Sequence, residues 1–154
     1  MKDTASNTIF NIYLLYPTNR DDEGNFYRML KTHTNIGVEI MAYLIDWEKM
    51  DYINDNTSFP KSRLYVPADH ELFIQYAYKD RLLAKEDISF INCKIIKESD
   101  LLILFGSNGS YSNIATELHF VKQEGIPIYT MPDLSPMAIE SLNLAIKLII
   151  RAEQ

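Results

Sequence analysis

Residues 99–131 hold the pattern that most restricts the fold of this chain. They read SDLLILFGSNGSYSNIATELHFVKQEGIPIYTM. The run DLLILFG is short and continuously apolar, which is typical of a strand buried on both faces. A polar loop, a helical pattern and a second apolar run, IPIYTM, follow it. Strand, helix and strand in this order predict a βαβ unit with two parallel strands in one sheet.

The first half of the chain has the same alternation. TIFNIYLLYP is apolar, β-branched and aromatic, and Pro17 ends it, so we expect a buried strand. Apolar residues then recur near helical spacing from Phe26 to about Trp47, and KTHTN is a candidate interruption of that helix. The polar segment 48–62 is predicted to be a surface loop, and RLYVP, residues 63–67, a short strand.

Residues 69–98 are predicted to form two helices with a break near 85–87. Gly125 suits the C-terminal cap of the helix before the last strand. At the start of the final helix, Ser135 is the expected N-cap and Pro136 the first helical residue. We therefore predict a single domain over 1–154: a three-layer, flavodoxin- or Rossmann-like α/β fold with four or five parallel strands and helices on both faces.

Composition narrows the function classes. The 154 residues carry a formal net charge of −6 without a basic patch, which disfavours polymeric nucleic acid as a partner. The lone Cys93 cannot form an internal disulfide, and it is expected to be a buried structural residue. The N-terminus lacks the apolar core of a signal peptide, and no run has the length of a membrane span. We expect a cytoplasmic protein without membrane association.

Three loops are expected to share the carboxyl edge of the sheet, where ligands bind in such folds. They are residues 16–20, 67–70 and 106–113, and Glu117 lies one turn into the helix after the third. An acid there has two interpretations. It interacts with the helix dipole and solvent, or it is a carboxylate that attacks an electrophilic sugar carbon in a cleft.

Three segments carry a resemblance to a known family: IYLLYP, INCKIIKESDLLILF and SNIATELHFVKQEGIPIY. Together they resemble the nucleoside 2-deoxyribosyltransferase-like superfamily, most strongly over residues 91–131. The resemblance places Glu117 on the family's nucleophilic glutamate and Asp100 on the aspartate that opens the buried strand. It implies a cofactor-free, retaining transfer in which the glutamate attacks the anomeric carbon of a nucleoside, a base departs, and a second base or water takes the sugar.

The sequence departs from the family at the acids that handle the base. Asn92 stands where the family has the base-handling aspartate, and Tyr111 stands near a further acid. An amide can orient a base through hydrogen bonds, but it has no readily transferable proton. Asp69 and Asp87 are the candidate spatial substitutes. These replacements keep two alternatives open: a non-catalytic nucleoside- or nucleotide-binding module, and a hydrolase of a nicotinamide dinucleotide like the TIR-like relatives.

The remaining predictions concern the ligand and the assembly. Aromatic residues at the first strand can stack on a base, and the loop before Glu117 is expected to line the site. The expected substrate-binding residues are Tyr13, Tyr16, Pro17, Ser107, Asn108, Ser112 and Asn113. The three histidines lack metal-ligand spacing, so no metal is expected. The family resemblance implies a homo-oligomer, for which the apolar stripe of the last helix, between Leu142 and Ile150, is a candidate interface.

Overall fold

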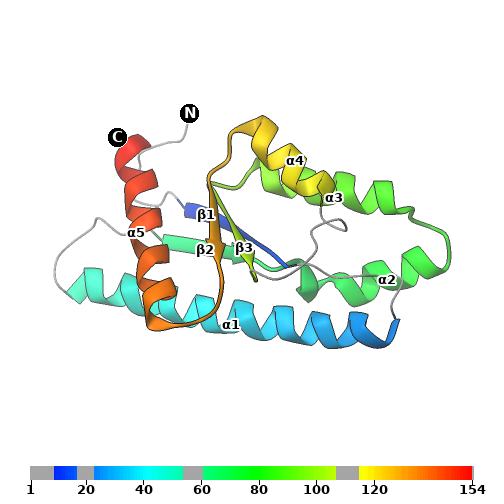
Figure 1. Cartoon of the computed structure of the whole chain (residues 1–154), viewed down its shortest axis with the longest axis horizontal. Coiled ribbons are helices and arrows are strands. Elements are labelled where there is room, and N and C mark those ends of the chain that lie inside the picture. Colours follow the sequence, from blue (N-terminus) through cyan, green and yellow to red (C-terminus); the bar gives the residue numbers. More distant parts are fainter. Residues whose placement is uncertain (1–8, 17–22, 54–60, 107–114, 154) are drawn as a thin grey trace.

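The computed structural model describes residues 9–16, 23–53, 61–106 and 115–153. Its strands are β1 (Ile9–Leu15), β2 (Lys61–Tyr65), β3 (Leu101–Phe105) and β4 (Ile128–Met131). Its helices are α1 (Glu23–Ile53), the short 3₁₀ helix η1 (Pro67–Asp69), α2 (Glu71–Lys79), α3 (Lys85–Lys97), α4 (Ala115–Glu124) and α5 (Pro136–Glu153). Figure 1 shows them around one sheet.

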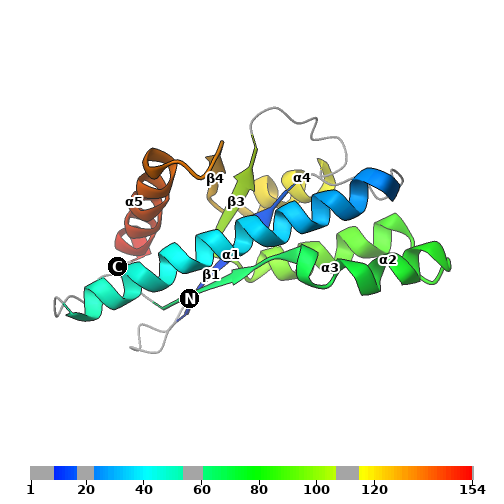
Figure 2. The same cartoon turned by 90° about the horizontal axis from the view of Figure 1, so that it is seen from below.

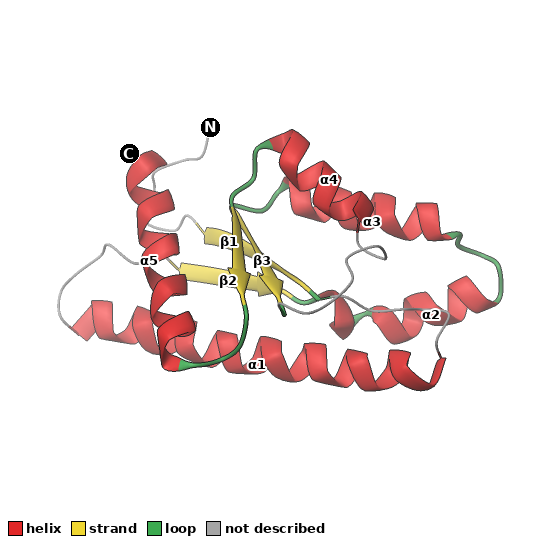
Figure 3. Ribbon diagram, in the orientation of Figure 1, coloured by secondary structure: helices red, strands yellow, loops and turns green. Residues whose placement is uncertain are grey.

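The four strands form one parallel sheet in the order β2-β1-β3-β4. Figure 3 shows β1 and β2 side by side, and the two strands pair in parallel. In this register Tyr13 is opposite Tyr65 on one side and Leu102 on the other. The predicted parallel α/β fold with helices on both faces is confirmed.

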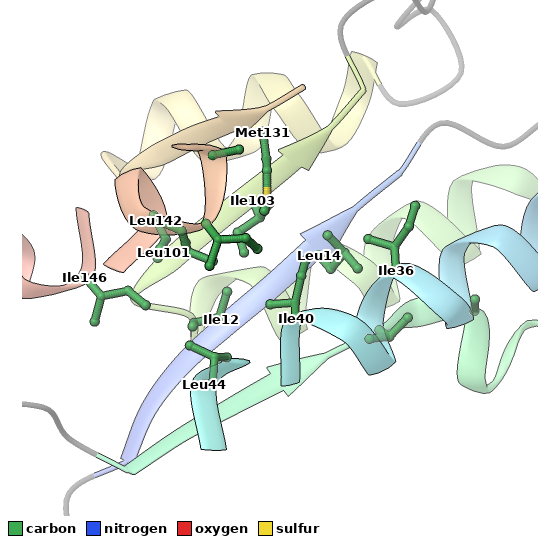
Figure 4. Packing of buried hydrophobic residues seen from close by; sticks show 14 of the residues in the cluster. Ile12, Leu14, Ile36, Ile40, Leu44, Leu101, Ile103, Met131, Leu142 and Ile146 are labelled. Atoms are coloured by element: carbon green, nitrogen blue, oxygen red, sulfur yellow. The ribbon is translucent and has the colours of Figure 1, made fainter. Parts of the chain in front are cut away.

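The two faces of the sheet bury different side chains, because successive residues of a strand point to opposite faces. One face packs against α1 and α5, and Figure 4 shows Ile12 and Leu14 of β1 near Ile36 and Ile40 of α1. The other face packs against α3 and α4, around Tyr13 and its neighbours. The members of this second cluster are Tyr13, Leu15, Ile96, Leu102, Leu104 and Val121.

Helix α1 corrects two predictions from the sequence. It runs without interruption from Glu23 to Ile53, through KTHTN and into the predicted loop 48–62 (Figure 2). Within KTHTN, Thr32 donates from its hydroxyl to the Arg28 carbonyl, 3.1 Å away, and the buried His33 contacts β1. Residues 48–50 are strong helix formers, and no glycine or proline stops the helix there.

Two other element boundaries differ from the predicted ones by a few residues. β2 begins at Lys61 rather than 63, because it pairs with β1 from Ile9 onward. The break between α2 and α3 precedes Lys85, and residues 85–87 form the first turn of α3. There Asp87 accepts a hydrogen bond from the Ala84 N–H at 2.8 Å, as an acid in a capping box does.

The two helix caps predicted in the last third of the chain are confirmed. Gly125 follows α4 with a φ of +70°, a left-handed conformation typical of a helix C-cap. Ser135 Oγ accepts a hydrogen bond from the Ala138 N–H at 3.2 Å, as an N-cap does, and α5 begins at Pro136. β4 is less buried than predicted, since it lies at the edge of the sheet and only Met131 is fully covered.

The apolar stripe of α5 divides between core and surface. Leu142 and Ile146 are buried in the core, and Ile149 and Ile150 pack against it. Leu144 and Leu148 are exposed, as is Met137 near the start of the helix. Core packing therefore accounts for part of the stripe, and the homo-oligomer stays a prediction. Over the residues that the structure describes, no helix has the length and apolarity needed to cross a bilayer.

Gly37 allows α1 to approach the end of β2 closely. A Cβ at this position would lie 2.6 Å from Cγ2 of the buried Val66. We expect Gly37→Ala to lower the free energy of unfolding by about 1–2 kcal/mol, because overpacking a core outweighs the gain of about 1 kcal/mol in helix propensity. Urea denaturation measures this change.

The matched control is Gly24→Ala in the same helix, where an added Cβ has no neighbour within 4 Å. It should be neutral or slightly stabilising. Adding Val66→Ala to Gly37→Ala should cost less than the sum of the two single substitutions, because the clash is relieved. Additive costs would show that the contact with Val66 is not the cause.

Candidate functional site

The carboxyl ends of β1, β2 and β3 lie at one edge of the sheet, because the three strands are parallel. The residues that follow them there are Tyr16, the segment 67–70 and Gly106. Helix α4 begins at Ala115, on the chain that returns from this edge. The described parts of the three loops are therefore at the same edge, as the sequence predicted.

Glu117 lies in the first turn of α4 and is buried, with 6% of its surface exposed. Val121, one turn later, is also buried, so both face the sheet. Glu117 Oε2 is shielded from solvent and has no hydrogen-bond partner among the described residues. Burying a polar atom without a partner costs about 1–3 kcal/mol. The interpretation of Glu117 as a solvent-facing helix residue is therefore wrong.

Tyr13 lies in β1 and is fully buried on the face that α3 and α4 cover. Its hydroxyl also has no hydrogen-bond partner among the described residues. The pKa of Tyr13 is raised well above 10, first by burial and then by the nearby negative charge of Glu117. Tyr13 therefore stays neutral and keeps its hydroxyl proton.

Glu71 is a second buried carboxylate that the sequence analysis missed. It lies in the first turn of α2, with 5% of its surface exposed. Its charge contributes to the raised pKa of Tyr13, after burial, Glu117 and Tyr65, and, after burial, to the raised pKa of Tyr65. A signal was present: Glu71 follows the exit of β2 at the start of a helix, just as Glu117 follows β3.

An aromatic row leads from the buried Tyr13 toward the surface. The ring of Tyr65 lies 5.4 Å from that of Tyr13 and 6.0 Å from that of the exposed His70, measured between centroids. Tyr65 is half-buried, and burial followed by the charges of Glu71 and Asp69 raises its pKa. Within this row, the half-buried Tyr65 and the exposed His70 have ring surface on which a planar ring can stack.

Cys93 of α3 is half-buried on the same side of the sheet. Burial and the charge of Glu117 raise the pKa of its thiol, so it stays protonated and is a poor nucleophile. Cys93 also lines an open groove of about 560 Å³ between α3 and α4, together with Thr116 and Phe120. Thr116 immediately precedes Glu117, so the groove borders the helical turn that carries the carboxylate.

Asn92 precedes Cys93 and is half-buried. It is one helical turn from Ile88 and from Ile96, both buried, and therefore lies on the inner side of α3. The charge of Glu117 contributes to the raised pKa of Cys93, the next residue in the chain. This part of α3 therefore lies in the same region as the carboxylate.

Asp100 lies at the other end of β3 from Glu117. It accepts a hydrogen bond from the Asn11 N–H at 2.8 Å, and its own N–H donates to the Asn11 carbonyl at 2.7 Å. The five residues of β3, at about 3.3 Å each, separate the two edges of the sheet by about 16 Å. The structure thus shows Asp100 joining β1 to β3 and does not bring it to Glu117.

Tyr16 is on the opposite face of the sheet from Glu117. On the side of α1, its ring lies 5.4 Å from that of His33 and 6.3 Å from that of Phe105, measured between centroids. The alternation of β1 separates it from Tyr13, because the two residues are an odd number of positions apart. Of the two predicted tyrosines, Tyr13 is the one whose hydroxyl is near the carboxylate.

The other predicted ligand-binding residues lie outside the described part of the chain. They are Pro17, Ser107, Asn108, Ser112 and Asn113. Tyr111 also lies outside it. Within the described ranges, no group of three or more histidine, cysteine, aspartate or glutamate side chains has an arrangement that suits a metal ion.

Comparisons with protein-family models, with curated proteins and with solved structures found no match to this chain.

Proposed function

We propose that this protein binds a nucleoside or nucleotide at the carboxyl edge of its sheet and cleaves or transfers at the N-glycosidic bond, with Glu117 as nucleophile. The observation that carries the proposal is the buried Glu117 carboxylate, whose Oε2 has no partner among the described residues, close to the neutral Tyr13 hydroxyl. The resemblance of residues 91–131 to nucleoside 2-deoxyribosyltransferases supports the same role.

The chemistry proceeds in two displacements. A carboxylate oxygen of Glu117 attacks the anomeric carbon as the bond from that carbon to the base breaks, and the electron pair of that bond goes to the base. The sugar is then held as a glycosyl ester. A second base, or water, attacks the same carbon and releases the carboxylate. Two inversions retain the configuration of the sugar.

In this scheme, the residues around Glu117 bind the sugar and the base. A neutral hydroxyl at Tyr13 is a hydrogen-bond donor for the sugar or for the carboxylate. The half-buried Tyr65 and the exposed His70 can stack on any base, since every base has a π face. Asn92 orients the base in this scheme, from the inner side of α3.

Base exchange is the direct test. The protein is incubated with each 2′-deoxynucleoside or ribonucleoside and a second free base, and the products are separated by liquid chromatography. We expect a new nucleoside, or free base if water is the acceptor. Neither exchange nor hydrolysis across the whole set would contradict a catalytic function.

Two alternatives give different results in the same set of measurements. The presence of Asn92 in place of an acid favours a binding module without turnover. Such a module would show nucleoside binding by calorimetry and retain affinity in Glu117→Ala. A nicotinamide dinucleotide hydrolase would instead release nicotinamide, and Glu117→Gln would abolish that release.

A further inference from the structure

The proposed reaction needs a proton for the departing base, because a base anion is a poor leaving group. Asn92 has no carboxyl proton to give, and neither does Tyr111. The two substitutes suggested by the sequence are also unsuitable. Asp69 is exposed, and the exposed Asp87 accepts a hydrogen bond from the Ala84 N–H at the start of α3.

Glu71 is placed where such an acid is needed. β2 pairs with β1 so that Tyr65 is opposite Tyr13, and η1 and α2 follow β2 directly. The first turn of α2 therefore lies at the carboxyl edge of the sheet, close to Tyr13. Gln75, one turn after Glu71, is also buried, so this face of α2 is turned inward.

Glu71 and Glu117 lie on two different helices, and each acts electrostatically on the same tyrosine. In its ionised form each carboxylate raises the pKa of Tyr13, with burial as the largest cause. Both carboxylates are buried, at 5% and 6% exposure. Among the described acids, these two combine burial with an electrostatic effect on the pKa of Tyr13. A pair of carboxylates around one sugar-binding position is the arrangement that retaining glycosidases use.

We propose that Glu71 is the acid–base residue of the reaction, and this inference rests on the function proposed above. In the first step the Glu71 carboxyl gives its proton to the base nitrogen that receives the electron pair of the broken glycosidic bond. Glu71 is left as a carboxylate. In the second step it takes a proton from the incoming base or water as the new bond to the anomeric carbon forms, which restores the carboxyl.

The test compares two substrates that differ in their need for a proton. The base of 2′-deoxyguanosine requires protonation to depart, whereas that of 7-methyl-2′-deoxyguanosine already carries a positive charge and leaves as a neutral molecule. We expect Glu71→Gln to lower kcat/KM by about 10²–10⁴-fold on the first, the usual contribution of a general acid, and by less than about tenfold on the second. Glu124→Gln, an exposed acid at the end of α4, is the control and should change neither.

Equal losses on both substrates in Glu71→Gln would overturn this inference and leave the role of Glu117 standing. If the wild-type protein turns over neither substrate nor any other nucleoside, the proposed function is contradicted, and so is the role of Glu71 that rests on it. Turnover of the methylated substrate by Glu71→Gln also shows that this variant is folded.

Discussion

Glu117→Gln is expected to lower turnover by about 10⁴-fold or more, because the amide cannot act as the nucleophile. Glu117→Leu should lose turnover to the same extent and gain stability. The carboxylate is buried, and its Oε2 lacks a hydrogen-bond partner among the described residues. An apolar side chain of similar volume removes that cost of about 1–3 kcal/mol. For a chain of this length each kcal/mol corresponds to about 2–4 °C in Tm.

Thermal unfolding of wild type, Glu117→Gln and Glu117→Leu measures the gain. Glu124→Gln is the matched control in the same helix and should change the free energy of unfolding by less than about 0.5 kcal/mol, because the residue is exposed. A lower Tm for Glu117→Leu would mean that the carboxylate stabilises the fold. That result would remove the main argument for a functional role.

Acidification from pH 6.5 to 4 is expected to cost about 3 kcal/mol of stability through His33 alone. Burial lowers the pKa of His33 from 6.5 to about 4, and its hydrogen bond to the Leu14 carbonyl only partly opposes this shift. Between these pH values the unfolded chain binds a proton that the folded chain does not. Stability from this residue is therefore complete above pH 6.5 and lost as the pH falls toward 4, at 1.36 kcal/mol for each unit of difference in pKa.

The structure gives the reason for the low pKa. His33 is 2% exposed, and its Nε2 lies 3.0 Å from the Leu14 carbonyl oxygen, to which it donates in the neutral form. Urea denaturation at several pH values should show a steep acid limb in wild type. The limb should be shallower in His33→Gln, which lacks the titrating ring, and unchanged in His119→Gln, where the histidine is exposed. An equal acid limb in wild type and His33→Gln would rule out His33 as its source.

The fold class could be predicted because it depends on local patterns. Continuous apolar runs such as DLLILFG cannot be exposed on either face, so they demand a parallel sheet covered by helices. The caps at Gly125 and Ser135 were predictable for the same reason, since each follows from backbone chemistry within a few residues. Helix continuity through KTHTN was not, because there the buried His33 is held by a carbonyl of a distant strand.

The site was predictable in part. The place of Glu117 after β3 follows from the order of strand and helix, and the parallel sheet brings the loops to one edge. Which tyrosine is near it depends on the face of β1, and the sequence predicted both Tyr13 and Tyr16, of which Tyr16 lies on the other face. Asp100 shows the same difficulty, since the position of a residue along a strand decides at which edge it lies.

The amino-acid sequence by itself determined the alternation of strands and helices, the parallel sheet and the turn that carries Glu117, because these follow from interactions between near neighbours. Only the tertiary structure decided that the charges of Glu71 and Glu117 both act on Tyr13. The three residues belong to α2, β1 and α4, and this electrostatic coupling depends on the strand order β2-β1-β3 and on which side of the sheet each helix packs. Burial of a carboxylate arises from that packing, since the surrounding side chains come from segments far apart in the chain.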